Sequence, residues 1–405
     1  MTRLDPHPAL TRRSALSAVL GAGVGVTFLG GHAFADDFTR RKLVVIVARG
    51  AMDGLSVAVP FGDPAYQPLR QDIAIPPDKV LPLDSTFGLH PKLKTLYALY
   101  QAGQARVAPA VAIPQRIRSH FEAQDLLETG GAQMYAASTG WLNRTLQAAQ
   151  PGRPIRALSI GAQEPLILRG PAMAESWSPG GRITPNTNRV ALALMDLYAD
   201  DALLGPALAT GLKVEDQANM LNGGKPLGGG DVKAFAVTAA KFLTAPDGPS
   251  IAVLSLDGFD THARQGAAEG QLANRLGIMD DVIAGLQQGM GPQWKDTVVV
   301  IATEFGRTAK VNGTGGTDHG TASTVILAGG ALRSGGPGSP SGIVGDWSTL
   351  AQDKLFEARD LAPTLDVRSV FKGVLIEHMG LDGRVLDTVV FPNSRDAQPV
   401  RGLIA

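Results

Sequence analysis

The sequence predicts an α/β fold built on a doubly wound, mainly parallel sheet flanked by helices. Continuous apolar runs rich in β-branched residues recur along the chain, and such runs are typical of strands buried on both faces. Segments with apolar residues at helical spacing separate these runs. Strands that alternate with helices favour a parallel sheet with helices on both sides.

The expected strands cover residues 43–48, 107–113, 250–256, 297–302 and 323–328. Helical spacing relates Leu93, Leu96 and Tyr100, and it also relates the apolar residues between 272 and 286. A last helix is expected over residues 361–379.

Two glycine-rich stretches interrupt this alternation. Residues 205–231 have the composition of a flexible connection or lid, and residues 333–342 that of a mobile surface loop. Strands on both sides of each stretch are needed to complete one sheet. We therefore expect a single domain over residues 36–405.

Residues 1–35 have the pattern of a secretory signal peptide. A basic start precedes an apolar stretch over residues 15–30, and Ala33-Phe34-Ala35 matches a cleavage site. The pair Arg12-Arg13 is typical of a twin-arginine signal. A single transmembrane anchor is the alternative, but the many small residues and the A-x-A site favour cleavage. We predict a periplasmic protein that uses the twin-arginine export machinery and has no stable membrane span in its mature chain.

Composition argues against several classes of function. The 37 basic and 37 acidic side chains balance, which gives no support for nucleic-acid binding. The absence of cysteine rules out disulfides, thiolate metal sites and cysteine nucleophiles.

Side chains that bind metals follow two of the expected strands. In LSLDGFDTH, Asp257, Asp260 and His262 come just after an apolar run. Asp260 and His262 are two residues apart and project to one side of an extended chain. The alternative is an exposed turn in which Asp260 caps a following helix.

The second such group lies in ATEFGRTAKVNGTGGTDHG, again just after an apolar run. It contains Glu304, Arg307, Asp318 and His319. Ligands in open α/β folds bind where strands emerge from the sheet. The two groups therefore predict one shared metal site at that edge.

Histidine usage supports this site, because three of the five histidines after the signal peptide, His120, His262 and His319, fall in such segments. Carboxylates and neutral imidazoles bind divalent cations. We predict one or two divalent metal ions, with zinc, manganese, magnesium and calcium all open.

Two further residues are candidates with competing interpretations. Asp53 follows the first expected strand and is either a metal ligand or part of an Asp-Gly turn; the run around it lacks the G-x-G-x-x-G spacing of a dinucleotide site. Ser119 forms a capping box with Glu122. Ser119 is also a candidate nucleophile, because helix starts favour anions and Arg116 and Arg118 stand beside it.

The chain resembles the domain-of-unknown-function 1501 family, within the alkaline phosphatase and sulfatase superfamily. The resemblance spans nearly the whole mature chain and rests on ARGAMDGLS, RSHFEAQDLLETG, LDGFDTHARQG, TEFGRT and GGTDHG. It implies an alkaline-phosphatase-like α/β domain with two divalent metals around a hydroxyl nucleophile that attacks a phosphate or sulfate ester.

The resemblance also implies roles for particular residues. It assigns to one metal Asp53, Ser119 and Glu304. It assigns to the other Asp257 or Asp260, His262 and His319. It assigns to the anion Arg307, with Arg49 or Arg118. The chain departs from the superfamily at Glu304-Phe305, where Asp-His is usual, and His120 is a candidate replacement for that imidazole. The sulfatase C/S-x-P-x-R signature is also absent.

Two hypotheses of function follow. The first is an exported metal-dependent hydrolase of a small anionic ester, with Ser119 and Arg307 catalytic. The second is a non-catalytic, metal-stabilised binding or assembly protein of the cell envelope. A serine hydrolase of the α/β-hydrolase type is disfavoured, because the chain has no G-x-S-x-G motif.

Overall fold

The computed structural model describes residues 40–149, 155–161, 164–178, 189–202, 204–223, 231–332 and 342–405. The expected signal peptide and nearly all of the 333–342 loop lie outside these residues. No helix within the described ranges is long and apolar enough to cross a membrane.

An eight-stranded sheet has the order β11-β5-β10-β9-β1-β8-β6-β7. Its strands are β1 (Lys42–Ala48), β5 (Ala105–Ala112), β6 (Ala157–Ile160), β7 (Ala174–Trp177), β8 (Ile251–Leu256), β9 (Thr297–Ala302), β10 (Ser323–Ala328) and β11 (Leu365–Asp366). Only β10, among these described strands, pairs antiparallel with its neighbours. The predicted mainly parallel sheet is confirmed.

The predicted strands occur where the apolar runs placed them. Every residue of β1 is buried, and its Val45 pairs with Val253 of β8 and Val300 of β9. A central parallel strand is buried on both faces, and this explains a continuous run such as KLVVIVA.

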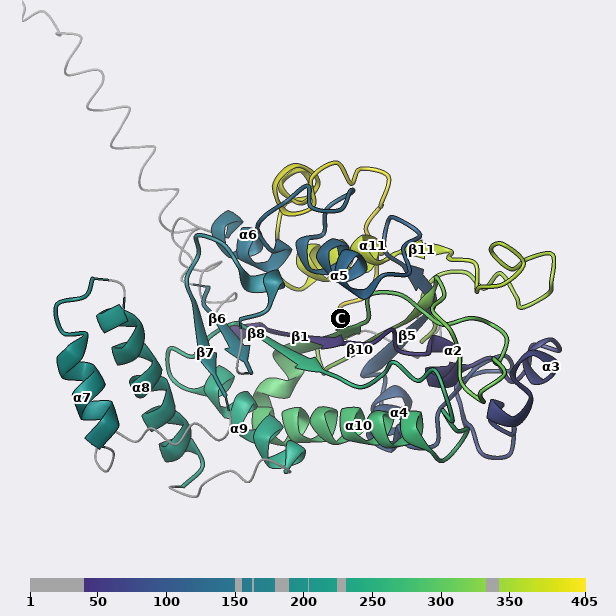
Figure 1. The fold of residues 1–405 in the computed structure, drawn as a ribbon, viewed down its shortest axis with the longest axis horizontal. Helices are drawn as coiled ribbons and strands as arrows, with labels where there is room; N and C mark the ends of the chain where they lie inside the picture. The colour runs from purple at the N-terminus through teal and green to yellow at the C-terminus, as the bar shows by residue number, and fades with distance from the viewer. Residues whose placement is uncertain are drawn as a thin grey trace, which may run out of the picture.

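Helices cover both faces of the sheet (Figure 1). On one face lie α5 (His120–Thr129), α6 (Trp141–Ala148) and α11 (Val367–Glu377). On the other lie α4 (Lys94–Gln101), α9 (Val232–Thr244) and α10 (Gln271–Met290). Alternate residues of β1 enter two separate cores: Val45 packs with the first helix layer and Ile46 with the second.

Smaller elements extend the domain beyond the sheet. A three-stranded sheet has the order β2-β4-β3. Its strands, with the nearby helices, are β2 (Ala58–Val59), β3 (Leu81–Pro82), β4 (Gly88–Leu89), α2 (Gly54–Val57), α3 (Tyr66–Arg70) and η1 (Gln71–Ile73). Further elements are η2 (Leu166–Leu168), α7 (Arg189–Leu197), η3 (Gly291–Asp296), α12 (Gly383–Val385) and η4 (Leu386–Val390).

The structure differs from the sequence-based expectation in two segments. Most of the stretch expected to be flexible is the helix α8 (Leu204–Leu221), which contacts β7 and buries Leu212, Val214 and Ala218. Its apolar residues outweigh the helix cost of its glycines, and residues 224–230 lie outside the described ranges. The last helix begins at Val367 rather than at 361, because the Asp366 carboxylate accepts the Arg368 amide N–H and caps it there.

The loops that carry the predicted metal ligands meet at one edge of the sheet. Parallel strands β1, β8 and β9 all end at this edge. Because β10 runs antiparallel to β9, the loop of residues 303–322 leaves and re-enters the sheet at the same edge. The start of α5, which follows β5, lies there as well.

Lys42 predicts a pH dependence of stability. Burial, with a smaller effect of Arg156, lowers its pKa to about 8. Between about pH 8 and pH 10.5 the unfolded chain therefore binds more protons than the folded protein, so the free energy of unfolding rises with pH across this window, by at most about 3 kcal/mol. Denaturant titrations from pH 8 to pH 10 on wild type and Lys42→Met test this. The variant should lack the rise, and equal slopes would contradict the assignment.

Candidate metal centre

Three imidazoles and one carboxylate converge at the carboxyl edge of the sheet. The Nε2 atom of His319 lies 3.1 Å from Nε2 of His120, 3.0 Å from Nε2 of His262 and 3.2 Å from Oδ1 of Asp260. Nε2 of His262 lies 2.9 Å from the same carboxylate oxygen. Ligand atoms of His120, Asp260 and His319 all lie within 4.8 Å of one another.

The Nδ1 atom of each imidazole has an oxygen atom of the protein as its neighbour, while Nε2 faces the cluster. The partner of His120 is Oε1 of Glu304 at 2.7 Å. The partner of His319 is the Arg118 carbonyl at 2.8 Å, and Oδ1 of Asp318 lies 3.5 Å from Nδ1 of His262. Metal-binding histidines usually have their second nitrogen fixed by such a carboxylate or carbonyl.

These contacts fix the tautomers and show that the residues suit a cation. The Arg118 carbonyl only accepts, so Nδ1 of His319 carries the hydrogen and its Nε2 presents a lone pair. The same reasoning applies to the neutral ring of His120 against the Glu304 carboxylate. Lone pairs that face one another repel, and a metal ion between them would turn the repulsion into coordination. Two nitrogens on one tetrahedral zinc ion lie about 3.3 Å apart, close to the spacing here.

The carboxylate in this cluster is positioned by a buried arginine. Nη1 of Arg307 donates to Oδ1 of Asp260 at 2.6 Å, and its Nε donates to Oγ1 of Thr317 at 3.1 Å. Burial opposes ionisation of Asp260, but the Arg307 guanidinium outweighs it and lowers the pKa of that carboxyl. The Arg307 side chain is fully buried, so its geometry is that of a positioning residue.

The loop after β1 supports Glu304. Oε1 of Glu304 accepts the Gly50 and Ala51 amides at 2.9 and 3.1 Å, and its Oε2 accepts the Thr303 hydroxyl. Burial would raise the pKa of Glu304, but the hydrogen bonds from His120, Gly50 and Thr303 outweigh burial, and the pKa is lowered. The Glu304 contact in turn raises the pKa of His120.

Glycines allow the loops to approach this closely. Gly50 has φ +107°, and a Cβ there would lie 2.7 Å from the Asp260 amide nitrogen. A Cβ on Gly316 would lie 2.3 Å from the His262 carbonyl. These contacts give a physical reason for the glycines of ARGAMDG and GGTDHG.

The structure places several predicted residues in this cluster. Asp260, His262 and His319 converge, and Glu304 and Asp318 lie behind two of the imidazoles. At the position where the motif resemblance led us to expect an imidazole, the ring of Phe305 packs 5.0 Å from those of His120 and His319.

Asp53 lies in a closed ion pair instead. Its carboxylate is fully buried and accepts two hydrogen bonds from Arg70, at 2.7 and 2.8 Å, with others from Ser56 and Gln265. Burial would raise the pKa of Asp53, but the Arg70 guanidinium outweighs burial, and the pKa is lowered. The described contacts of this carboxylate are all with donors of Arg70, Ser56 and Gln265, so the structure does not bring Asp53 to the cluster.

Ser119 is the N-cap residue of α5, but its hydroxyl makes no capping hydrogen bond. The expected capping box is therefore wrong, and the hydroxyl is left available beside His120. The Arg118 guanidinium binds Asp360 and Glu357, and that of Arg49 binds Glu128. Both arginines suggested for the anion are thus committed to carboxylates.

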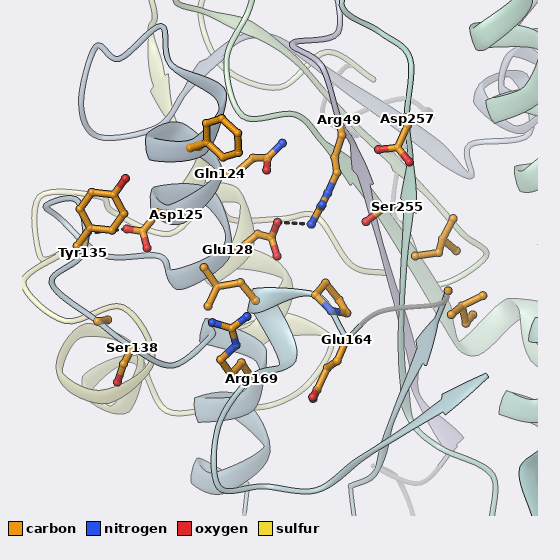
Figure 2. A pocket seen from close by; sticks show the side chains of 17 residues that line it. Arg49, Gln124, Asp125, Glu128, Tyr135, Ser138, Glu164, Arg169, Ser255 and Asp257 are labelled. Atoms are coloured by element: carbon orange, nitrogen blue, oxygen red, sulfur yellow. Dashed lines mark hydrogen bonds and ion pairs between the residues drawn. The ribbon is translucent and has the colours of Figure 1, made fainter. Parts of the chain in front are cut away.

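Asp257 is exposed and lines a neighbouring cleft of about 940 Å³ rather than joining the cluster (Figure 2). Figure 2 shows Arg49 and Glu128 pointing toward one another within this cleft.

Sequence reasoning missed the residues that act only through contacts. Examples are Arg70, which closes Asp53 off, and Asn312, whose Nδ2 donates to the His262 carbonyl and to Asp318. Neither carries a sequence signal that sets it apart. His120 had such a signal, because it belongs to the same small set of histidines.

The fold and this cluster define an α/β protein with a histidine-rich candidate metal centre at the carboxyl edge of a mainly parallel sheet. The model of the family described as "Protein of unknown function (DUF1501)" matches residues 97–390. The chain belongs to this family, as the motifs predicted. No curated protein sequence matches it.

Solved structures of similar fold are distant in sequence. Ps i-CgsB in complex with k-i-k-neocarrahexaose has 10% identity, a TM-score of 0.40 and coverage of 89% of this chain and 77% of its own. The phosphonate monoester hydrolase of Agrobacterium radiobacter has 11% identity, a TM-score of 0.39 and coverage of 84% and 74%. The C-terminal periplasmic domain of EcEptC from Escherichia coli, in complex with zinc, has 10% identity, a TM-score of 0.34 and coverage of 71% and 72%.

Glu304→Gln tests whether this residue orients His120. The amide oxygen can still accept from Gly50 and Ala51, so the fold should persist, while the weaker acceptor should reduce metal affinity by about 10–100-fold. Competition titration with a chelating dye measures this. Glu128→Gln is the matched control, because Glu128 is equally buried and also accepts a backbone N–H, from Ile167, but contacts none of the three imidazoles in the described contacts. Equal affinities in both variants would contradict the role.

Proposed function

We propose that this protein is an exported metal-dependent hydrolase of a phosphate or sulfate ester. Its centre would hold one divalent metal through His120, Asp260 and His319, whose ligand atoms all lie within 4.8 Å of one another. His262, beside His319 and Asp260, is a fourth candidate ligand. The observation that carries the proposal is the convergence of these atoms while each Nδ1 is held from behind.

The ligand set favours particular metals. Three imidazoles suit zinc and other borderline cations, whereas magnesium and calcium prefer oxygen. Of the metals left open by the sequence, zinc is therefore proposed first and manganese second. One metal per chain is proposed, because Phe305 stands where the superfamily supplies a further imidazole.

The centre is accessible to a substrate. The side chains of the four ligands are 24–46% exposed. A metal bound there would act as a Lewis acid that polarises an ester oxygen. Arg307 would keep the Asp260 carboxylate in place, and the Ser119 hydroxyl, free of its cap, is the proposed nucleophile. The reaction consumes one water and releases an alcohol and inorganic phosphate or sulfate.

The ester class and the cellular location rest on sequence. The motif resemblance implies attack on a phosphate or sulfate ester. The twin-arginine pattern of residues 1–35 implies export to the periplasm in the folded state, which suits a protein that acquires its metal before export.

The experiment is turnover of a panel of aryl and alkyl phosphate and sulfate esters by zinc- and manganese-loaded protein, before and after EDTA. At least one ester should be hydrolysed, and EDTA should abolish the reaction. Metal-loaded protein that is inactive across the panel would contradict the proposal. Ser119→Ala should lower kcat at least about a hundredfold with metal content unchanged. A smaller loss would assign the attack to water.

A non-catalytic, metal-stabilised protein is the second candidate. If His262 binds the metal together with His120, Asp260 and His319, four protein ligands would fill a tetrahedral zinc site, which is typical of structural centres. In that case EDTA should lower the melting temperature, Ser119→Ala should leave function intact and no ester should be hydrolysed.

A further inference from the structure

The cleft beside the centre is a separate feature with its own chemistry. It has a volume of about 940 Å³ and lies between α5 and the ends of β6 and β8 (Figure 2). This volume lies within the range of small-molecule sites. None of the four proposed metal ligands lines it.

Three segments join the cleft to the metal centre. Arg49 lines the cleft, and the next residue, Gly50, binds Glu304 behind His120. The helix α5 presents His120 to the centre and Phe121 to the cleft. Asp257 lines the cleft three residues before Asp260. The cleft therefore adjoins the segments that carry the ligand cluster.

Charged side chains of both signs line the cleft. The acidic ones are Asp125, Glu128, Glu164 and Asp257, and the basic ones are Arg49 and Arg169. Figure 2 shows them on several sides of the cavity, with Arg49 paired to Glu128. A simple anion would meet an excess of carboxylates, and a simple cation would leave the exposed guanidinium of Arg169 without a partner in the ligand.

A polyhydroxylated ligand suits this mixture of signs. Each hydroxyl group donates to a carboxylate and accepts from a guanidinium. The planar side chains of Glu164, Arg169 and Gln124 present paired atoms to adjacent hydroxyls. Glu128 is already paired with Arg49, and Asp125 already accepts the Tyr135 amide N–H. The groups exposed to a ligand are therefore the carboxylates of Glu164 and Asp257 and the guanidinium of Arg169, and an uncharged ligand with many hydroxyls can bind both kinds.

Aromatic rings add an apolar surface. Phe121 is 84% exposed and Tyr135 is 68% exposed, and both line the cleft. Each ring offers the cleft a flat apolar face, and Tyr135 adds a hydroxyl group. The C–H face of a sugar ring matches such a ring, because it too is apolar on one side.

We propose that the cleft binds an uncharged sugar unit, which forms the alcohol part of the ester. The sugar class follows from the cleft, and its place in the ester rests on the proposed function.

Saturation-transfer NMR with lactose, maltose and cellobiose tests binding on the full mature chain, with and without EDTA. At least one disaccharide should receive saturation in both conditions, because the cleft contains none of the metal ligands. The double variant Phe121→Ala/Tyr135→Ala should bind about tenfold more weakly. Met173→Ala is the matched control, since Met173 is 88% exposed and does not line the cleft.

Binding of none of the three sugars would overturn the proposal, as would an unchanged affinity in the double variant. Binding of choline in the absence of sugar binding would overturn it in favour of a cationic ligand. Sugar binding without hydrolysis of any ester would contradict the proposed function and leave the cleft assignment standing. Hydrolysis of an aryl ester without sugar binding would contradict the cleft assignment alone.

Discussion

Asp260→Ala is expected to bind its divalent metal at least about a hundredfold more weakly than wild type, because the variant lacks a proposed ligand and not merely a supporting contact. Asp257→Ala should bind as wild type does. The two aspartates lie in one loop and are both exposed, but only Asp260 contacts the imidazoles. Elemental analysis of purified protein and a zinc titration measure the difference.

A second substitution separates metal loss from misfolding. Asp260→Ala leaves the buried Arg307 without its carboxylate, which can destabilise the fold. Asp260→Asn keeps an oxygen acceptor for Arg307 and should fold like wild type while it still binds metal weakly. Asp257→Ala that loses its metal, or Asp260→Asn that keeps wild-type affinity, would contradict the assigned ligand set.

Asp53→Ala is expected to lower the free energy of unfolding by about 3–5 kcal/mol, because it leaves the fully buried Arg70 guanidinium unpaired. The folded fraction should still bind metal as wild type does, since the Asp53 carboxylate is saturated by Arg70, Ser56 and Gln265. Urea unfolding followed by tryptophan fluorescence measures stability, and elemental analysis measures metal.

The partner of this ion pair provides the control. Arg70→Ala should be about as destabilising as Asp53→Ala, because it strands the carboxylate instead. Replacing both residues, as in Asp53→Ala/Arg70→Met, should recover part of the loss. Metal loss in Asp53→Ala with unchanged stability would restore Asp53 as a ligand, as the resemblance implied.

The two predictions concern acids that look alike in the sequence. Asp53 and Asp260 each follow a buried strand. Asp53 is next to Gly54, and one residue separates Asp260 from Gly258. Their environments differ, because Asp53 faces Arg70 from α3 and Asp260 faces three imidazoles. Such partners come from distant parts of the chain and leave no local signal.

The sequence by itself determined the fold class and the edge of the sheet at which chemistry gathers. Buried parallel strands require continuous apolar runs, so the strands KLVVIVA and TVVVIA can be recognised from their own residues, without knowledge of the strands they pair with. Parallel strands end at one edge, so the acids and imidazoles that follow them had to be neighbours.

Only the tertiary structure decided which of those residues converge. Because β10 runs antiparallel to β9, β10 starts at the edge where β9 ends. His319, in the loop between these strands, therefore lies at that edge beside Asp260 and His262. The start of α5 then contributes His120 through a contact that spans 199 residues. The periodicity of apolar residues is a local property of the chain. A metal site instead needs loops that are distant in the sequence to lie side by side, and long-range packing sets the strand order that brings them together.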